Sequence, residues 1–128
     1  MKLLLDTHTL LWFVAGDSRL SDAAREALES PQNEPLVSIA SLWEMAIKIS
    51  LGKLDVGMAL VEFARDHIEG NGIGLLGLTS PQVVRIASMP FHHRDPFDRL
   101  LIAQAQEEGI QVVGCDQAFS AYGVTLLW

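Results

Sequence analysis

Cysteine is almost absent from this chain, since Cys115 is the only one among 128 residues. A single thiol cannot form an internal disulfide, and no cysteine or histidine spacing around it is typical of a zinc site. A disulfide-stapled domain and a zinc module are therefore excluded. We expect Cys115 to be a small buried side chain near the end of a strand, in a protein of the cytoplasm.

Long hydrophobic runs are also missing. The opening Met1–Leu5 segment resembles the start of a signal peptide, but Asp6 interrupts it after three leucines. No later apolar stretch approaches the roughly 18 residues that a membrane span needs. The sequence therefore predicts neither a leader nor a membrane helix.

Positive charge is scarce: nine Lys and Arg residues face sixteen Asp and Glu residues, for a formal net charge of −7. This balance argues against a protein that holds nucleic acid through a broad basic surface. A metal-dependent nuclease is less affected, because bound cations supply positive potential where the phosphate lies. Any contact with RNA is expected to be local.

The remaining composition is that of a folded domain. Hydrophobic residues make up 49% of the chain and charged residues 20%, which excludes a disordered or fibrous protein. The length predicts one domain, residues 1–128. Short apolar runs predict five strands: Lys2–Leu5, Leu36–Ile39, Ile73–Leu78, Gln111–Gly114 and Val124–Leu127.

Helical patterns separate these strands. The expected helices are Thr9–Ala15, Asp22–Glu29 with Ser21 as its N-cap, a helix from Ser41 that stops at Gly52, Met58–His67, Ser80–Ser88, Phe97–Glu108 and a short turn at Gln117–Ala121. Alternation of strands and helices favours an α/β fold, a three-layer α/β/α sandwich with a central parallel sheet of four to five strands.

Four acidic residues stand where strands give way to helices: Asp6, Glu44, Asp98 and Asp116. In an open parallel sheet, ligands bind outside the carboxyl ends of the strands, where the strand order reverses. Carboxylates gathered there repel one another unless a cation compensates them. Oxygen ligands favour a hard divalent ion, so the pattern predicts a site for Mg²⁺ or Mn²⁺.

Helix capping is the alternative explanation for each acid taken alone. Glu44 lies three residues after Ser41, the spacing of a capping box, and Asp98 lies three after Asp95. The other two acids can cap the helix that follows each strand. The metal site is favoured by the four acids together, not by any one of them.

Four segments resemble the PIN-domain family, specifically the bacterial toxins called VapC. They are Leu3–Thr7 (LLLDT), Trp43-Glu44, Asp95–Ala105 (DPFDRLLIAQA) and Val112–Asp116 (VVGCD). The resemblance spans nearly the whole chain, and the segment that begins at Asp98 is its most specific part. The family often carries a polar triplet such as Thr-Arg-Asn at the fourth site, where this chain has Gly114-Cys115-Asp116.

The resemblance implies a PIN-like fold and a Mg²⁺- or Mn²⁺-dependent endoribonuclease. It further implies a toxin that forms a homodimer and is restrained by a cognate antitoxin protein, whose tail covers the active site. Its acidic quartet, both metal-binding and catalytic, falls on Asp6, Glu44, Asp98 and Asp116. Asp95 is a second candidate in the same segment.

Other polar residues are weaker candidates. Thr7 and Ser38 can hydrogen-bond to the metal ligands, although hydroxyls at strand ends more often cap helices. Arg94 and Lys48 can contact RNA phosphates, although isolated basic residues are usually solvated. We expect His92 and His93 to be loop residues and Trp12 and Trp43 to be core.

Two other functions, a phosphatase and a receiver-type signalling domain, fit the sequence poorly. A phosphatase with an aspartyl nucleophile needs a second Asp two residues after Asp6, where His8 stands. A receiver domain needs an early acidic pair and a late lysine, but the chain has Leu4-Leu5 and no lysine after Lys53. The remaining alternative is a catalytically silent PIN-fold module that uses the acidic pocket for partner recognition.

Overall fold

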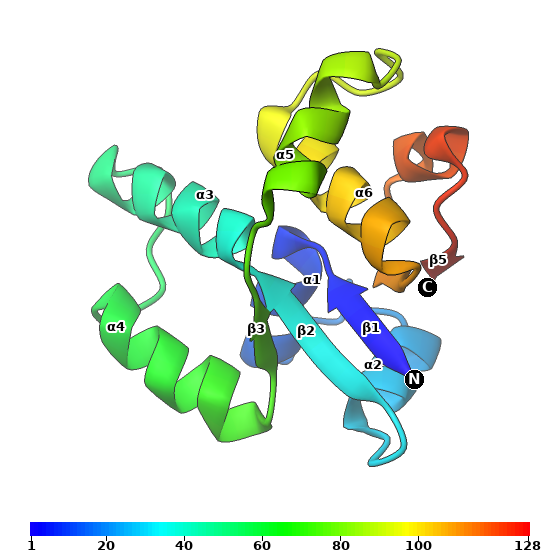
Figure 1. The fold of residues 1–128 in the computed structure, drawn as a ribbon. Coiled ribbons are helices and arrows are strands. Elements are labelled where there is room, and N and C mark those ends of the chain that lie inside the picture. Colours follow the sequence, from blue (N-terminus) through cyan, green and yellow to red (C-terminus); the bar gives the residue numbers. More distant parts are fainter.

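The computed structural model describes residues 1–128 and is built on one parallel sheet (Figure 1). The strands are β1 (Lys2–Leu5), β2 (Glu34–Ser38), β3 (Gly74–Leu76), β4 (Gln111–Val113) and β5 (Leu126–Leu127). They lie in the order β3-β2-β1-β4-β5, and every neighbouring pair is parallel.

The run of leucines in the central strand β1 follows from burial of the strand on both faces of the sheet. Leu4 pairs with Leu36 on one side and with Val112 on the other. All three leucines of the strand have no exposed surface, and they alternate between two cores on opposite faces of the sheet. A strand covered on both faces has no polar side to show, which is why its sequence is continuously apolar.

One face of the sheet is covered by α1 (Thr7–Ala15), α2 (Asp22–Glu29) and α4 (Leu60–Phe63). The last of these continues through a wider turn at Ala64–Ile68 and a tight turn at Glu69–Asn71. Helix α3 (Ile39–Ser50) adds Met45 to the same core. The main buried members of this core are Leu3, Leu5, Leu10, Leu28, Val37, Met45, Phe63 and Ile68.

The opposite face is covered by α6 (Pro96–Glu108), with α5 (Ser80–Arg85) packed against it and a short helical segment at Gln117–Tyr122 beside it (Figure 1). Its core is formed by Leu4, Leu36, Leu101, Ile102, Val112 and Phe119, among others. The two cores and the sheet between them confirm the predicted three-layer α/β/α sandwich.

Two helices begin earlier than predicted. Helix α3 begins at Ile39, because the hydroxyl of Ser38 accepts a hydrogen bond from the backbone N–H of Ala40. The prediction that Ser41 begins this helix is therefore wrong, and with it the capping box of Glu44. Helix α1 begins at Thr7 rather than Thr9, since Asp6 is its N-cap.

Two burial predictions are also wrong. Cys115 is exposed, because β4 ends at Val113 and the chain has left the sheet before the cysteine. Trp43 is 56% exposed and packs edge-on against Phe97, since it lies on the outer side of α3. Trp12 is partly buried against the first core, as expected.

The strand order places the switch point between β1 and β4. The chain moves outward from β1 to β2 and β3, and then returns to β4 on the other side of β1. The carboxyl ends of β1 and β4 thus form the crevice where α/β sheets bind ligands. None of the helices combines the length and the hydrophobicity that a membrane span requires.

Candidate active site

Asp6 is fixed at the carboxyl end of β1, against β4. Its Oδ1 accepts a 2.7 Å hydrogen bond from the backbone N–H of Thr9, and its own N–H donates to the carbonyl of Val113. The Thr9 hydroxyl donates to that same carbonyl at 2.9 Å. Burial raises the pKa of Asp6, although the hydrogen bonds from Thr9 lower it. The carboxylate is therefore held at the switch point by the backbone around it.

Gly114 gives Asp6 the space it occupies. A Cβ on residue 114 would lie 2.6 Å from Asp6 Oδ2 and 3.1 Å from its Cγ. A Cβ atom is essentially never found this close to another heavy atom, so any side chain at this position would displace the carboxylate. The glycine after β4 is thus a steric requirement of the site.

Glu44 lies on the second turn of α3 and is held by two polar partners. The Thr7 hydroxyl donates to Glu44 Oε1 at 2.8 Å, and its oxygen lies 2.9 Å from Ser41 Oγ. Lys48 Nζ donates to Glu44 Oε2 at 2.8 Å, and this hydrogen bond raises the pKa of Lys48. No basic residue adjoins Glu44 in the sequence, but Lys48 follows it by one helical turn and reaches its carboxylate.

Asp98 lies in the first turn of α6 with its side chain free of the helix cap. The cap is Asp95, whose Oδ1 accepts hydrogen bonds from the backbone N–H groups of Phe97 and Asp98 at 2.9 and 3.0 Å. Asp95 therefore performs the capping role that was the alternative for Asp98. The carboxylate of Asp98 is left to face the carboxyl edge of the sheet.

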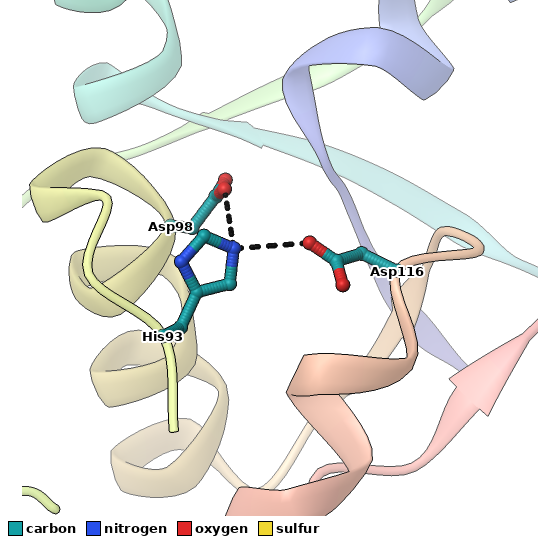
Figure 2. Close-up of side chains that lie close together, drawn as sticks. All are labelled: His93, Asp98 and Asp116. Atoms are coloured by element: carbon teal, nitrogen blue, oxygen red, sulfur yellow. Dashed lines mark hydrogen bonds and ion pairs between the residues drawn. The ribbon is translucent and has the colours of Figure 1, made fainter. Parts of the chain in front are cut away.

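Asp98 and Asp116 are brought together by His93 (Figure 2). His93 Nε2 lies 3.0 Å from Asp98 Oδ2 and 3.0 Å from Asp116 Oδ2. Asp116 follows β4, and its Oδ1 caps the helical turn after it by accepting from the N–H of Ala118 at 3.0 Å. One imidazole thus links an acid of α6 to an acid at the end of β4.

The loop that carries His93 is anchored from behind by Arg99 and Tyr122. The guanidinium of Arg99 donates to the carbonyls of Pro90 and Met89 at 2.9 and 3.3 Å. The Tyr122 hydroxyl donates to Pro90 and accepts a 2.9 Å hydrogen bond from the N–H of His93. Arg99 is buried without a carboxylate partner, so it does not pair with its neighbour Asp98.

The site carries more negative charge than its own residues neutralise. Burial and the nearby charge of Asp95 raise the pKa of Asp98 to about 7, with further contributions from Glu44 and Asp6 and an opposing one from His93. An ionised carboxylate in this place is disfavoured unless a cation joins it. The charge at this edge is therefore suited to a cation.

The donor atoms also fit a divalent metal. One ligand atom from each of His93, Asp98 and Asp116 lies within 4.8 Å of the other two. Two of these donors are carboxylate oxygens and the third is an imidazole nitrogen, a set that can hold a divalent cation. Asp6 and Glu44 are outside that group of three, although their charges act on Asp98. We call Asp6 and Glu44 the buried acids, and His93, Asp98 and Asp116 the open cluster.

The weaker candidates fall into three places. Thr7 contacts a predicted ligand directly, as described above. The Ser38 hydroxyl caps α3 and forms a hydrogen bond with Gln104, and it contacts none of the acids. Arg94 is exposed and forms no ion pair, so it is free to meet a solvent-borne phosphate.

Sequence reasoning undervalued His93 and Lys48 and did not notice Gly114. His93 lies in a loop, as predicted, but its position two residues before the helix cap Asp95 directs its ring to Asp98 and Asp116, a contact that the sequence did not predict. Lys48 stands four residues after Glu44, the spacing of an ion pair on a helix, which was a usable signal. Gly114 gave no such signal, because its contact with Asp6 joins distant parts of the chain.

A cavity of about 510 Å³ opens beside the buried acids, between α1 and the segment that follows α3. Its polar lining includes Thr7, Lys48 and Lys53, and Trp12 lies on its wall. Arg19, Asp17 and Asp55 line it as well, so the charge of this recess is mixed. The cavity is connected to the buried acids through Thr7 and Lys48, which both contact Glu44.

The sequence and the fold of this chain are similar to those of known proteins. The PIN domain family model matches residues 3–124. The chain is 28% identical over 120 residues to ribonuclease VapC22 of Mycobacterium tuberculosis (strain ATCC 25618 / H37Rv), covering 93% of this chain and 90% of that protein. A solved structure of VapBC2 from Rickettsia felis, bound to a DNA fragment from their promoter, has a TM-score of 0.69.

The Rickettsia felis match covers 98% of this chain and 97% of that chain at 13% sequence identity. A likeness at this level of identity concerns the fold, which agrees with the parallel sheet and its two helical layers.

Proposed function

This chain belongs to the PIN domain family, and from that premise we propose that it is a metal-dependent endoribonuclease, the toxin of a toxin–antitoxin pair. We propose further that residues 1–128 act as a single nuclease domain that hydrolyses RNA phosphodiester bonds. The similarity to ribonuclease VapC22 supports the reaction class.

The observation that carries the proposal is the concentration of acids at the switch point of the sheet. Asp6 stands at the end of β1 and Asp116 beyond the end of β4, while Asp98 carries a pKa raised to about 7 by burial and by neighbouring acids. Gathering carboxylates that repel one another destabilises a fold, so such a group is typical of a site where a cation binds, as in a metal-dependent hydrolase.

Asp6, Glu44, Asp98 and Asp116 are the residues that we assign to the ion, with Mg²⁺ or Mn²⁺ as its identity. A divalent ion bound there supplies a water of lowered pKa and positive charge for the scissile phosphate and the leaving oxygen. Asp95 stays a second candidate, since it caps α6 through Oδ1 just as Asp6 and Asp116 cap their own helical segments.

The chain's own residues orient this set. Thr9 and Gly114 fix the carboxylate of Asp6, and Thr7 fixes that of Glu44. Lys48 holds positive charge at the mouth of the recess, where its ammonium group can turn from Glu44 to an RNA phosphate once a cation has joined the acids. Ligand orientation of this kind is what makes metal-assisted hydrolysis efficient.

The net charge of −7 predicts local rather than general RNA contacts, and the basic residues are placed accordingly. Lys48 and Lys53 line the recess beside the acids, and Arg94 is exposed on the loop that precedes α6. A cognate antitoxin protein and a second copy of this chain are the proposed protein partners. The solved VapBC2 assembly of similar fold supports the first of these.

The test is cleavage of a panel of single-stranded and structured RNAs by the purified protein. Reactions contain Mg²⁺, Mn²⁺ or EDTA, and the Asp98→Asn variant is run beside the wild type. Asp22→Asn is the matched control, because Asp22 is an exposed acid at the start of α2, outside the site. We expect metal-dependent cutting by the wild type and by the control, and none by Asp98→Asn.

Two other outcomes would redirect the proposal. Cutting that continues in EDTA, or in Asp98→Asn, contradicts the metal mechanism. Metal binding without cutting of any RNA favours the alternative function, a binding module that uses the acidic pocket for partner recognition.

A further inference from the structure

The open cluster contains a hydrogen-bond arrangement that determines where a proton lies. The backbone N–H of Asp95 donates to Nδ1 of His93 at 3.1 Å, so Nδ1 is an acceptor and carries no proton. A neutral imidazole has one proton, and it must then be on Nε2. Nε2–H points at Asp98 Oδ2 and Asp116 Oδ2, each 3.0 Å away (Figure 2).

This tautomer is unsuited to metal ligation in the observed orientation. A histidine binds a metal through an unprotonated nitrogen. Nε2 is protonated, while the lone pair of Nδ1 is directed at a backbone N–H. His93 therefore belongs to the open cluster as a donor to the two acids.

The Nε2 proton occupies the space beside the two acids on the side of the loop. A hydrogen bond places its proton about 2 Å from each acceptor oxygen. Mg²⁺ binds its oxygens at roughly the same distance, about 2.0–2.1 Å. A cation that approached Asp98 and Asp116 from the side of His93 would therefore compete with Nε2–H for the same carboxylate oxygens.

We propose that His93 takes the place of the cation: its Nε2–H holds Asp98 and Asp116 together in the metal-free protein, and metal binding displaces it from those oxygens. This inference rests on the proposed function, because it needs a metal at the open cluster. It makes His93 a positioning residue that competes with the ion, rather than a ligand of the ion.

The main chain of His93 is held by hydrogen bonds that do not involve its ring. Its backbone N–H is bound to the Tyr122 hydroxyl at 2.9 Å, and Arg99 donates to its carbonyl at 3.4 Å. These contacts hold the main chain on both sides. The side chain is 16% exposed and its ring packs edge-on against Phe119, so the displacement that we propose is a rotation about the side-chain bonds while the main chain stays in place.

The experiment measures Mn²⁺ affinity by the electron paramagnetic resonance signal of free Mn²⁺, at one fixed pH. The proteins are the wild type, His93→Ala and His93→Leu, which lack the donor, with His92→Ala as the control. His92 is exposed and packs edge-on against Tyr122, outside the acids. Losing a competing charged hydrogen bond should tighten Mn²⁺ binding roughly tenfold in both His93 variants.

A second readout follows the proton. In ¹⁵N NMR spectra, Nε2 of His93 should be the protonated nitrogen in the metal-free protein. On addition of Mg²⁺, its proton resonance should shift as the hydrogen bonds to the acids break, while the proton stays on Nε2. Loss of the proton from Nε2 on Mg²⁺ binding would identify a ligand and overturn the proposal.

The outcomes separate this inference from the proposed function. If the wild type binds Mn²⁺ and folded His93→Ala and His93→Leu bind it equally or more weakly, the competition is refuted while the metal site stands. If the wild type binds no Mn²⁺ at concentrations that support cleavage, the metal assignment itself fails, and this inference with it.

Discussion

Asp6 and Glu44 are 8% and 5% exposed, whereas the side chains of Asp98 and Asp116 are 26% and 45% exposed. The buried acids are fixed by the fold itself: Thr9 and the end of β4 hold Asp6, while Thr7 and Lys48 hold Glu44. The open cluster depends on a single imidazole that comes from a loop. One half of the acidic edge is therefore preorganised, and the other half can rearrange.

This difference gives the two halves separate tasks. The hydrogen bonds from Thr9 to Asp6 and from Thr7 to Glu44 come from protein groups, so we expect them to persist whether or not an ion is present. The open cluster faces solvent, from which ion, water and RNA arrive. A site of this kind combines rigid ligands with an entrance that changes partners, as metal-assisted hydrolysis requires.

The largest effect is expected from removing one charge in either half. Asp6→Asn and Asp98→Asn should both reduce RNA cleavage to the level seen in EDTA, because each half supplies ligands. Their stabilities should differ. Asp98→Asn relieves repulsion from Asp95 and should raise the metal-free free energy of unfolding by about 1–2 kcal/mol.

Asp6→Asn should have little effect on stability, since an asparagine oxygen can still accept the hydrogen bond from Thr9. RNA cleavage assays measure the effect on activity, and urea unfolding measures the effect on stability. Circular dichroism of each variant checks that it is folded. Wild-type cutting rates in either variant would show that the two halves do not form one site.

The next effect comes from pushing Asp6 out of place while keeping its charge. In Gly114→Ala the new methyl group would meet Asp6 Oδ2 at 2.6 Å. We expect a loss of about 10–100-fold in metal affinity or cleavage, as for displaced ligand geometry. Gly77→Ala is the control, because a Cβ there meets nothing within 4 Å and its backbone needs no positive φ. Equal activity of the two variants would mean that Asp6 need not be fixed.

A smaller effect is expected from loosening Glu44. Thr7→Val removes the hydroxyl that donates to Glu44 Oε1 and should lower metal affinity by about tenfold. Thr125→Val, at an exposed position beyond the site, is the control. Isothermal titration with Mn²⁺ measures the change, and an unaltered affinity would place Glu44 outside the ligand set.

The smallest effect concerns Lys48. Lys48→Met leaves the buried carboxylate of Glu44 without its cation, so the metal-free protein should lose about 1 kcal/mol of stability. Saturating Mn²⁺ should restore most of that loss. Lys53→Met, which removes a lysine from the same recess without breaking an ion pair, is the comparison. Thermal unfolding of both variants, with and without Mn²⁺, measures the change in melting temperature. Equal changes in the two variants would rule out a role for the Lys48–Glu44 ion pair.

The layers of the fold could be predicted because their signal is local. The leucines of β1, the Ser21 cap of α2 and the pattern of α6 each occupy a few consecutive residues. The start of α3 was misplaced by two residues because Ser38 and Ser41 are equally good caps in isolation. Only the pairing of β2 with β3, which extends to Ser38, distinguishes them.

The site was less predictable, because its geometry depends on contacts between distant segments. Asp6 and Asp116 could be predicted from their places at strand ends and Glu44 and Asp98 from their places near helix starts, and the assignment of all four as ligands stays a prediction. Their partners depend on packing: Gly114 meets Asp6 across the sheet, and His93 reaches Asp116 over 23 positions of sequence. No local pattern contains such contacts.

The most direct test of the central claim is a crystal structure with Mn²⁺, using its anomalous scattering to locate the ion. We predict a peak at the carboxyl ends of β1 and β4, with carboxylate oxygens of Asp6 and of the open cluster at roughly 2.1–2.2 Å. A fully occupied Mn²⁺ elsewhere on the molecule, with these carboxylates unligated, would contradict the account.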